Sequence, residues 1–382
     1  MPDIDRREAI AWLIATLAAA LVDIGVARAA APRDCPLREA PFSVDTPLLD
    51  ILLSPTATAA LREEPAFARF LDHAQPMMLR TTTPSFAAIV TPRSLTSWAR
   101  LAPEALPAVD ARLRRVTVTA TDRRLRCARY DDTPPALPAL PRDRPAMLVF
   151  EKITGFRDEP SVRAAHDALD SLARQLGWSV VFTEQAGVMR PTLLAKFAVV
   201  VWNNVSGDVL TSSQRAAFRA YVERGGGFVG IHGSGGDPVG FWPWYLDELV
   251  GARFLGHPMA PQFQTATVTL SDRGRSLAPN LPASWSMKDE WYSFVANPRA
   301  SGAQVVATLD ESTYEPTATL AMGADHPIAW TRQPRKGRAF YTAIGHLPET
   351  YEDPRVLELL RSGIRWAAAG NLGARATGAR GN

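Results

Sequence analysis

The sequence predicts a doubly wound α/β domain on a mainly parallel sheet, preceded by a small, mostly helical module. From residue 147 onward, short and almost continuously apolar segments alternate with longer segments whose apolar residues recur at helical spacing. Strands that are apolar on both faces fit a parallel sheet that helices cover on both sides. Before residue 133 the chain instead shows short helical patterns interrupted by prolines.

The first 29 residues have the features of an export signal. Arg6 and Arg7 form a twin-arginine-like start, residues 10–22 are an apolar core, and an A-x-A cleavage site ends at Ala29. We therefore expect a cleaved signal peptide and a periplasmic or secreted protein; an uncleaved anchor or an amphipathic helix is the alternative. The apolar run is shorter than the roughly 20 residues of a bilayer-spanning helix, so we expect no stable membrane span.

Residues 30–132 predict a small α-rich module. Ser54 and Pro55 supply a helix cap followed by a proline at the first helical position. Residues 115–121 alternate in the manner of one half-buried strand, which leaves open an α+β module. Cys35 and Cys127 are the two cysteines of the chain, and they either form one disulfide or stay free.

A proline-rich segment, residues 133–145, predicts a semi-rigid linker, and the α/β domain then occupies residues 146–370. The strands that we expect cover residues 147–153, 178–183, 197–202, 228–231, 262–270, 303–309, 328–332 and 337–344. We expect one helix to begin at Pro160, a second to follow a cap at Ser212 and Ser213, and a third to cover residues 354–369. Residues 371–382, rich in Gly, Ala and Arg, predict a disordered tail.

The charge distribution argues against a nucleic-acid partner. The 42 Lys and Arg residues are nearly balanced by 39 Asp and Glu residues, which leaves a formal charge of +3 without a long basic run. A nucleic-acid-binding surface needs a concentrated basic patch. We therefore look for chemistry on a small molecule.

Polar residues follow the predicted strands at the points where the strands end. Phe156 and Arg157 follow the first strand, Asn204 follows the third, His232 the fourth, and His346 a late strand. The functional groups of an open parallel sheet gather at the carboxyl ends of its strands. These side chains are therefore expected to share one rim.

Several short motifs stand in the order seen in ThuA-like (trehalose-utilisation) proteins, which belong to the class I glutamine-amidotransferase-like superfamily with a flavodoxin-like sheet. The motifs are GGGFVGIH at 225–232, WPWY at 242–245, LVGARF at 249–254, HP at 257–258, DEWY at 289–292, HPIAW at 326–330 and GH at 345–346. Residues 147–370 resemble this family, and the resemblance implies carbohydrate metabolism. One departure is Asp158, which follows Phe156-Arg157 where ThuA-like proteins commonly have a histidine.

The resemblance places His232 where related amidotransferases carry a catalytic cysteine. The α/β domain contains no cysteine, so glutamine hydrolysis through a thioester is excluded. An imidazole at this turn can act as a general base, a general acid or a metal ligand, because its ordinary pKa is about 6.5. A structural histidine in a buried turn is the alternative.

The other candidates lie at the strand ends or among the aromatic residues around an acidic pair. The catalytic candidates are His232, His346, Asp289 and Glu290; the substrate-binding candidates are Phe156, Arg157, Asn204, Trp242, His257, Trp291 and Tyr292. Aromatic faces stack on pyranose rings while carboxylates accept hydroxyl hydrogen bonds, which favours a sugar site. The alternatives are exposed turns, a surface acid pair and aromatic core packing.

Two functions remain open. One is an exported enzyme that uses acid/base chemistry on a sugar, glycoside or keto-sugar, as a hydrolase or isomerase, with His232 and His346 transferring protons and Asp289 or Glu290 holding hydroxyls. The other is a non-catalytic sugar-binding or scaffold domain. No cofactor is certain, and a divalent metal on His232, His257 and His346 is a further hypothesis. The sequence does not predict the oligomeric state.

Overall fold

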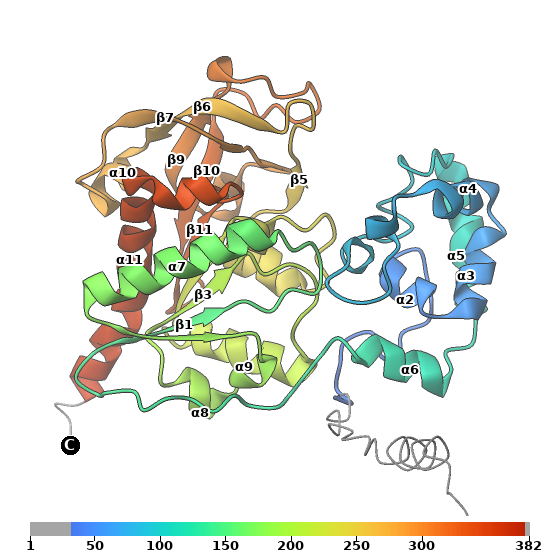
Figure 1. Cartoon of the computed structure of the whole chain (residues 1–382), viewed down its shortest axis with the longest axis horizontal. Helices are drawn as coiled ribbons and strands as arrows, with labels where there is room; N and C mark the ends of the chain where they lie inside the picture. Colours follow the sequence, from blue (N-terminus) through green and yellow to red (C-terminus); the bar gives the residue numbers. More distant parts are fainter. Residues whose placement is uncertain (1–31, 379–382) are drawn as a thin grey trace, which may run out of the picture. The chain divides into compact units, whose positions relative to one another are not determined.

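The computed structural model describes residues 32–378 (Figure 1). The predicted signal peptide, residues 1–29, lies outside the described residues, and so do residues 379–382. Within the described part of the chain, no helix is both long and apolar enough to cross a membrane.

The N-terminal module is helical. Its α-helices are α2 (Leu48–Leu52), α3 (Pro55–Arg62), α4 (Pro65–His73), α5 (Leu106–Arg114) and α6 (Ala120–Cys127). Ser54 caps α3 as predicted, since its side chain accepts a hydrogen bond from Ala57 N. The strand predicted for residues 115–121 is wrong, because Thr119 and Asp122 form a capping box that begins α6 there.

Cys35 and Cys127 form a disulfide, with their Cα atoms 5.6 Å apart. The bond joins the start of the described chain to the last residue of α6. Of the two alternatives that the sequence left open, the structure therefore has the bridged one. Residues 133–141, which follow the module, form neither helix nor strand.

Five parallel strands form one half of the main sheet, in the order β2-β1-β3-β4-β11. They are β1 (Ala146–Phe150), β2 (Ser179–Thr183), β3 (Val199–Asn203), β4 (Gly227–Ile231) and β11 (Arg338–Thr342), and all residues of β1, β3 and β4 are buried. Figure 1 shows α7 (Glu159–Leu176) and α11 (Pro354–Gly378) on one face of this sheet, and α8 (Pro191–Leu194) and α9 (Ser212–Glu223) on the other. The doubly wound prediction is thus confirmed.

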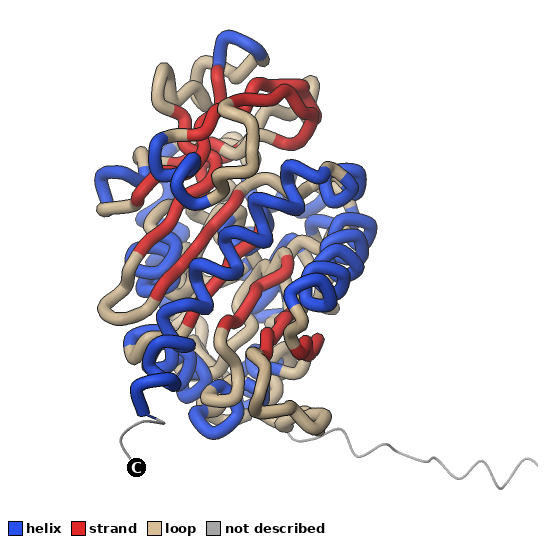
Figure 2. Tube along the Cα trace, turned by 90° about the vertical axis from the view of Figure 1, so that its left-hand side faces the viewer, coloured by secondary structure: helices blue, strands red, loops and turns tan. Residues whose placement is uncertain are grey.

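Four antiparallel strands extend the sheet beyond β11. They are β10 (His326–Arg332), β9 (Gln304–Asp310), β6 (Phe263–Leu270) and β7 (Ser284–Glu290), with α10 (Asp272–Leu277) packed beside them. A separate pair consists of β5 (Phe254–Gly256) and β8 (Ser293–Phe294). Figures 1 and 2 show the antiparallel strands gathered at one end of the α/β domain.

The predicted strands overlap the observed ones, but β7, β5 and β8 were not predicted. In β7 every second residue is exposed and a buried aspartate stands among the inward-facing residues, so the segment lacks an apolar run. The cap of α9 is Thr211, which forms a capping box with Gln214, and not Ser212 or Ser213. Helix α11 continues to Gly378, so residues 371–378 of the predicted tail are helical.

Candidate active site

His232 lies on a strained turn immediately after β4. Its φ of +39° is in the left-handed region, which costs energy for a residue with a Cβ atom. A Cβ atom on Gly235 would lie 2.6 Å from Tyr341 Oη, so the turn fits only with a glycine there. Asn204, also left-handed at φ +52°, accepts a hydrogen bond from Gly233 N at 3.1 Å. The structure therefore places the Asn204 side chain as a support of the turn.

The imidazole of His232 has a fixed orientation. Its Nδ1 donates to the carbonyl oxygen of Ala343 at 2.7 Å, because a carbonyl can only accept. The Nε2 atom faces His346 Nδ1 at 3.1 Å and Glu290 Oε2 at 3.4 Å. The ring centroid lies 4.2 Å from that of Tyr292, and the residue is only 3% exposed. Nε2 thus presents its lone pair to the cluster.

Glu290 joins the imidazoles from the end of β7. Its Oε2 lies 2.9 Å from His346 Nδ1, and its Oε1 accepts a hydrogen bond from Gln262 Nε2 at 2.5 Å. His257 Nδ1 lies 3.2 Å from the same Oε1. Among the described residues, no lysine or arginine lies within ion-pair distance of this buried carboxylate, and the groups that lie within that distance are imidazoles.

The cluster shifts the pKa values of its members in opposite directions. Burial raises the pKa of Glu290, but its interactions with the imidazoles of His232 and His346 outweigh burial and bring it well below its usual range. Burial lowers the pKa of His346, but the hydrogen bond and charge of Glu290 outweigh burial and raise it. The arrangement therefore favours an ionised Glu290 beside a protonated His346.

Asp289 lies behind the cluster and is fully buried. Its carboxylate accepts hydrogen bonds from the backbone N–H groups of Gly345 at 2.7 Å, His346 at 3.1 Å and Leu347 at 3.2 Å. Burial raises its pKa, and the backbone N–H groups that it accepts from oppose this effect only in part. The structure thus gives Asp289 the role of holding the turn that carries His346, whereas the sequence suggested contact with a sugar hydroxyl.

Aromatic side chains surround His346. The ring of Phe156, which is 41% exposed, lies 6.4 Å from the imidazole, and that of Phe263 lies 5.1 Å from it. Phe156 N donates to Ser206 Oγ at 3.0 Å, which fixes the loop after β1. Arg157 pairs instead with Glu159 and Glu184 at the surface. Phe156 thus borders the cluster, while the guanidinium of Arg157 is held by other protein groups.

Asp158 lies at the end of the loop after β1, immediately before α7. Its side chain caps α7 by accepting a hydrogen bond from Ser161 N at 3.1 Å. Ser161 Oγ in turn donates to the carbonyl oxygen of His346. Asp158 and Ser161 therefore support the His346 turn from the helix side.

Both tryptophans among the substrate-binding candidates pack against other protein groups. Trp291 is fully buried, and its Nε1 donates to the carbonyl oxygen of Gln264 at 2.8 Å. Trp242 packs against Phe218, Trp244 and Tyr245 rather than against the imidazole cluster. An aromatic residue near an acidic pair or a strand end has the same sequence signature in a core as in a ligand site, which explains both assignments.

Sequence reasoning missed Gln262 and Phe263, which reach the cluster from the start of β6. Phe263 pairs with Glu290 in the β6–β7 ladder, so their contact depends on a strand pairing that no local pattern indicates. It also missed Asp237, whose carboxylate accepts hydrogen bonds from Ser206 Oγ at 2.5 Å and Gly207 N at 2.6 Å. Burial raises the pKa of Asp237 to about 7.

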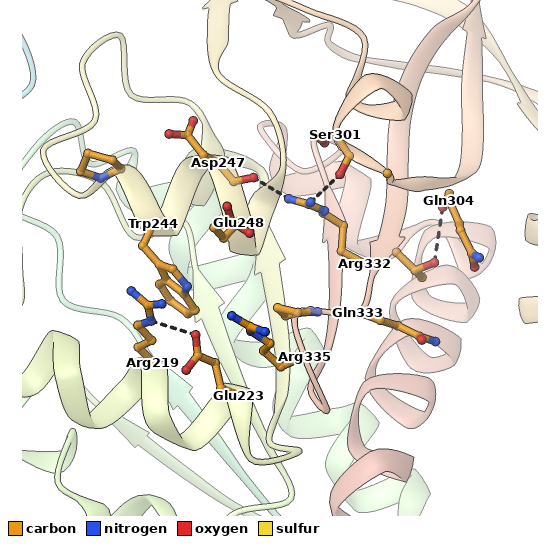
Figure 3. A pocket seen from close by; sticks show the side chains of 14 residues that line it. Arg219, Glu223, Trp244, Asp247, Glu248, Ser301, Gln304, Arg332, Gln333 and Arg335 are labelled. Atoms are coloured by element: carbon orange, nitrogen blue, oxygen red, sulfur yellow. Dashed lines mark hydrogen bonds and ion pairs between the residues drawn. The ribbon is translucent and has the colours of Figure 1, made fainter.

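A cavity of about 770 Å³ lies at the opposite end of the parallel strands, where β10 ends and β11 begins (Figure 3). Several of its charged side chains already bind other protein groups. Arg219 pairs with Glu223, and Arg332 donates to the carbonyl oxygens of Asp247 and Ser301. We place the site at the imidazole cluster, because side chains that can transfer protons converge there, whereas Arg219 and Arg332 of the cavity already bind other protein groups.

Comparison with known proteins agrees with the fold. Residues 146–367 match the model of a family described as ThuA, trehalose utilisation. The structure is similar to that of a ThuA-like protein from Bacteroides uniformis ATCC 8492, at 26% identity over 61% of this chain and 95% of that chain (TM-score 0.51). A ThuA-like protein from Parabacteroides merdae ATCC 43184 is similar at 18% identity over 59% of this chain and 91% of that one (TM-score 0.47). The search of curated proteins gave no match.

Proposed function

This chain belongs to the ThuA family, and from that premise we propose that it is an exported enzyme that acts on a carbohydrate by proton transfer at His232, Glu290 and His346. The observation that carries the proposal is the convergence of the two imidazoles on one buried carboxylate, with atoms 2.9 to 3.4 Å apart.

The cluster has the parts of an acid/base pair. His232 Nε2 holds a lone pair, because its Nδ1 proton is committed to the Ala343 carbonyl, and so suits a general base. Glu290 raises the pKa of His346, which then suits a general acid near neutral pH. A base and an acid held side by side can take a proton from one substrate atom and give one to another.

A carbohydrate substrate is supported by the family and by the surroundings of His346. The family is described by trehalose utilisation. Phe156 and Phe263 flank the imidazole, and aromatic rings of this kind stack on the apolar faces of sugars. The substrate class that we propose is a glycoside or its keto-sugar form, transformed by hydrolysis or isomerisation.

Export is part of the proposal. The signal-like residues 1–29 are its main support. The bridge between Cys35 and Cys127 adds to it, because disulfides persist in the oxidising periplasm or outside the cell and are rare in the cytosol. Cell fractionation with detection of the mature N-terminus would test this part, and a full-length protein retained in the cytoplasm would contradict it.

The enzyme proposal can be tested with a panel of disaccharides and their keto forms. We expect turnover by the mature protein and a loss on the order of 10²–10⁴-fold in His232→Ala. The matched control is His166→Gln, which alters an imidazole that pairs with Glu151 outside the cluster. Sugar-dependent thermal stabilisation without turnover in the wild type would instead favour the scaffold function.

A further inference from the structure

We infer that His232 Nε2, His346 Nδ1 and Glu290 Oε2 together bind one divalent transition-metal ion, of which zinc is the best match. The three atoms lie within 4.8 Å of one another and come from three separate strand ends, of β4, β11 and β7. The inference uses the same site as the proposed function but does not depend on it, because an ion can bind whether or not a sugar is turned over.

The spacing of the three atoms fits a metal coordination shell. The distances are 3.1 Å between the two nitrogens, 2.9 Å from His346 Nδ1 to Glu290 Oε2 and 3.4 Å from His232 Nε2 to Glu290 Oε2. Zinc binds such ligands at about 2.0–2.2 Å, so neighbouring ligand atoms of a tetrahedron lie about 3.3 Å apart. The triangle therefore matches one face of a zinc tetrahedron.

Neutral side chains provide too few N–H donors to hydrogen-bond all three atoms of this triangle to one another. The single N–H of neutral His232 is committed to the Ala343 carbonyl, so its Nε2 can only accept. Glu290 Oε2 also accepts, and only His346 Nδ1 is left to donate to both atoms. One proton shared by three converging atoms is a weak arrangement, whereas a cation takes a lone pair from each.

The charge around the cluster also favours a cation. Glu290 and Asp289 are adjacent and almost fully buried, and a buried carboxylate is costly unless it is paired. Among residues 32–378, neither has a lysine or arginine within ion-pair distance. A divalent ion at Glu290 would supply a positive charge that does not depend on the protonation of an imidazole.

Each proposed ligand is held by a further protein group, as is usual in metal sites. The Ala343 carbonyl orients His232, Gln262 Nε2 donates to Glu290 Oε1, and Asp289 fixes the backbone at His346. Two imidazoles and one carboxylate without a thiolate suit zinc or a similar transition metal, and a catalytic zinc with this ligand set keeps a fourth position open. Ca²⁺ and Mg²⁺ prefer oxygen ligands.

A bound ion would change the roles proposed above for His232 and His346. Both nitrogens of the acid/base pair would then be ligands, and the ion itself would polarise a substrate oxygen or activate water. His257, whose Nδ1 lies 3.2 Å from Glu290 Oε1 and 3.0 Å from the carbonyl oxygen of Pro258, is the imidazole near Glu290 that is not a proposed ligand. The ion is thus expected at the centre of the site, with His257 beside it.

The test is the metal content of the full mature protein, measured by elemental analysis without any sugar. We expect about one zinc or similar ion per chain, a rise in melting temperature when Zn²⁺ is added to chelator-stripped protein, and visible absorption of the Co²⁺-substituted form. Glu290→Gln is nearly isosteric and should weaken the ion's affinity on the order of a hundredfold or more while the circular dichroism spectrum stays unchanged. His166→Gln should bind the ion as the wild type does.

Three outcomes separate this inference from the proposed function. Stoichiometric metal without turnover of any sugar would overturn the function alone. Full turnover by the stripped protein in the presence of chelator would overturn the metal site alone. Absence of stoichiometric metal, together with unchanged melting temperatures on addition of Zn²⁺, Co²⁺ or Mn²⁺, would also overturn the metal site.

Discussion

At the residue scale, Asp289 and Glu290 are adjacent in the chain but make different contacts. Glu290 faces the imidazoles, whereas Asp289 accepts hydrogen bonds from the backbone of the next strand end. Alternation along β7 cannot explain this, because both side chains are buried where the strand ends. The pair is therefore one reactive carboxylate and one that positions His346.

Asp289→Asn tests the positioning role. An asparagine has one acceptor oxygen and turns an N–H group toward backbone N–H donors, so at least one of Gly345 and Leu347 loses its acceptor. We expect the free energy of unfolding to fall by about 1–3 kcal/mol. Turnover should fall with it, since His346 shifts.

Urea unfolding followed by circular dichroism measures the Asp289 effect. Asp143→Asn, which changes an exposed carboxylate in the linker, is the control and should leave the stability unchanged. Equal stabilities of the two variants would show that the hydrogen bonds of Asp289 do not hold the turn.

At the scale of elements, the loops after β1, β3, β4 and β11 form the site because each is tied to the next. Ser206, in the loop after β3, accepts from Phe156 N and donates to Asp237 in the loop after β4. Asp237 also accepts from Gly207 N. The loop carrying Phe156 is thus held through Ser206 by one half-buried carboxyl group.

The pKa of Asp237 predicts a pH dependence of stability. Burial raises its pKa to about 7 in the folded state, above the ordinary 3.8, so the folded protein binds this proton more tightly than the unfolded chain does. The resulting stabilisation is fully present below about pH 4 and is lost as the pH rises to about 7. Asp237→Asn should therefore lose less stability than the wild type between these pH values.

Unfolding midpoints of both proteins between pH 4 and pH 8 check the Asp237 prediction, with Asp143→Asn again as the control. The expected result is a shallower decline in Asp237→Asn only. Parallel curves for all three proteins would mean that Asp237 keeps an ordinary pKa.

Gly345 ends the turn before His346 and has a φ of +139°. A Cβ atom on it would lie 2.4 Å from Tyr351 Oη, so Gly345→Ala forces both a strained backbone and a clash. Gly302 also has a positive φ, +84°, but no atom lies within 4 Å of its Cβ position. Gly302→Ala therefore measures the cost of the backbone conformation without a clash. We expect Gly345→Ala to cost about 1–3 kcal/mol more stability than Gly302→Ala.

Thermal or urea unfolding of the two glycine variants gives the comparison directly. Gly345→Ala should also lower turnover, because the clash displaces the neighbouring His346, whereas Gly302→Ala should retain it. Identical losses of stability in the two variants would contradict the close contact with Tyr351.

At the scale of the whole molecule, the disulfide closes the N-terminal module over a separation of 92 residues. Cross-links over loops of this length restrict the unfolded chain and typically contribute about 2–5 kcal/mol. The Cys35→Ser, Cys127→Ser double variant should lose stability of this size, and the reduced wild type should match it. An unfolding curve that neither substitution nor reductant changes would contradict the prediction.

The fold could be predicted because buried parallel strands leave continuous apolar runs, such as the one in β1. His232 and His346 could be found because they follow such strands. The edge strand β7 escaped prediction because its residues alternate, and Gln262 because only the pairing of β6 with β7 brings it to Glu290. Trp242 was assigned to the site because sequence does not separate a packed aromatic from an exposed one.

The central claim is that Glu290 and its two imidazoles form a catalytic centre for a carbohydrate. The most direct measurement is the turnover rate of the mature protein and of Glu290→Gln on a panel of glycosides and their keto forms, at equal folded concentration. The account predicts measurable turnover by the wild type and a loss on the order of 10²–10⁴-fold in the variant. Equal rates in the two proteins, on a substrate that both clearly process, would contradict it.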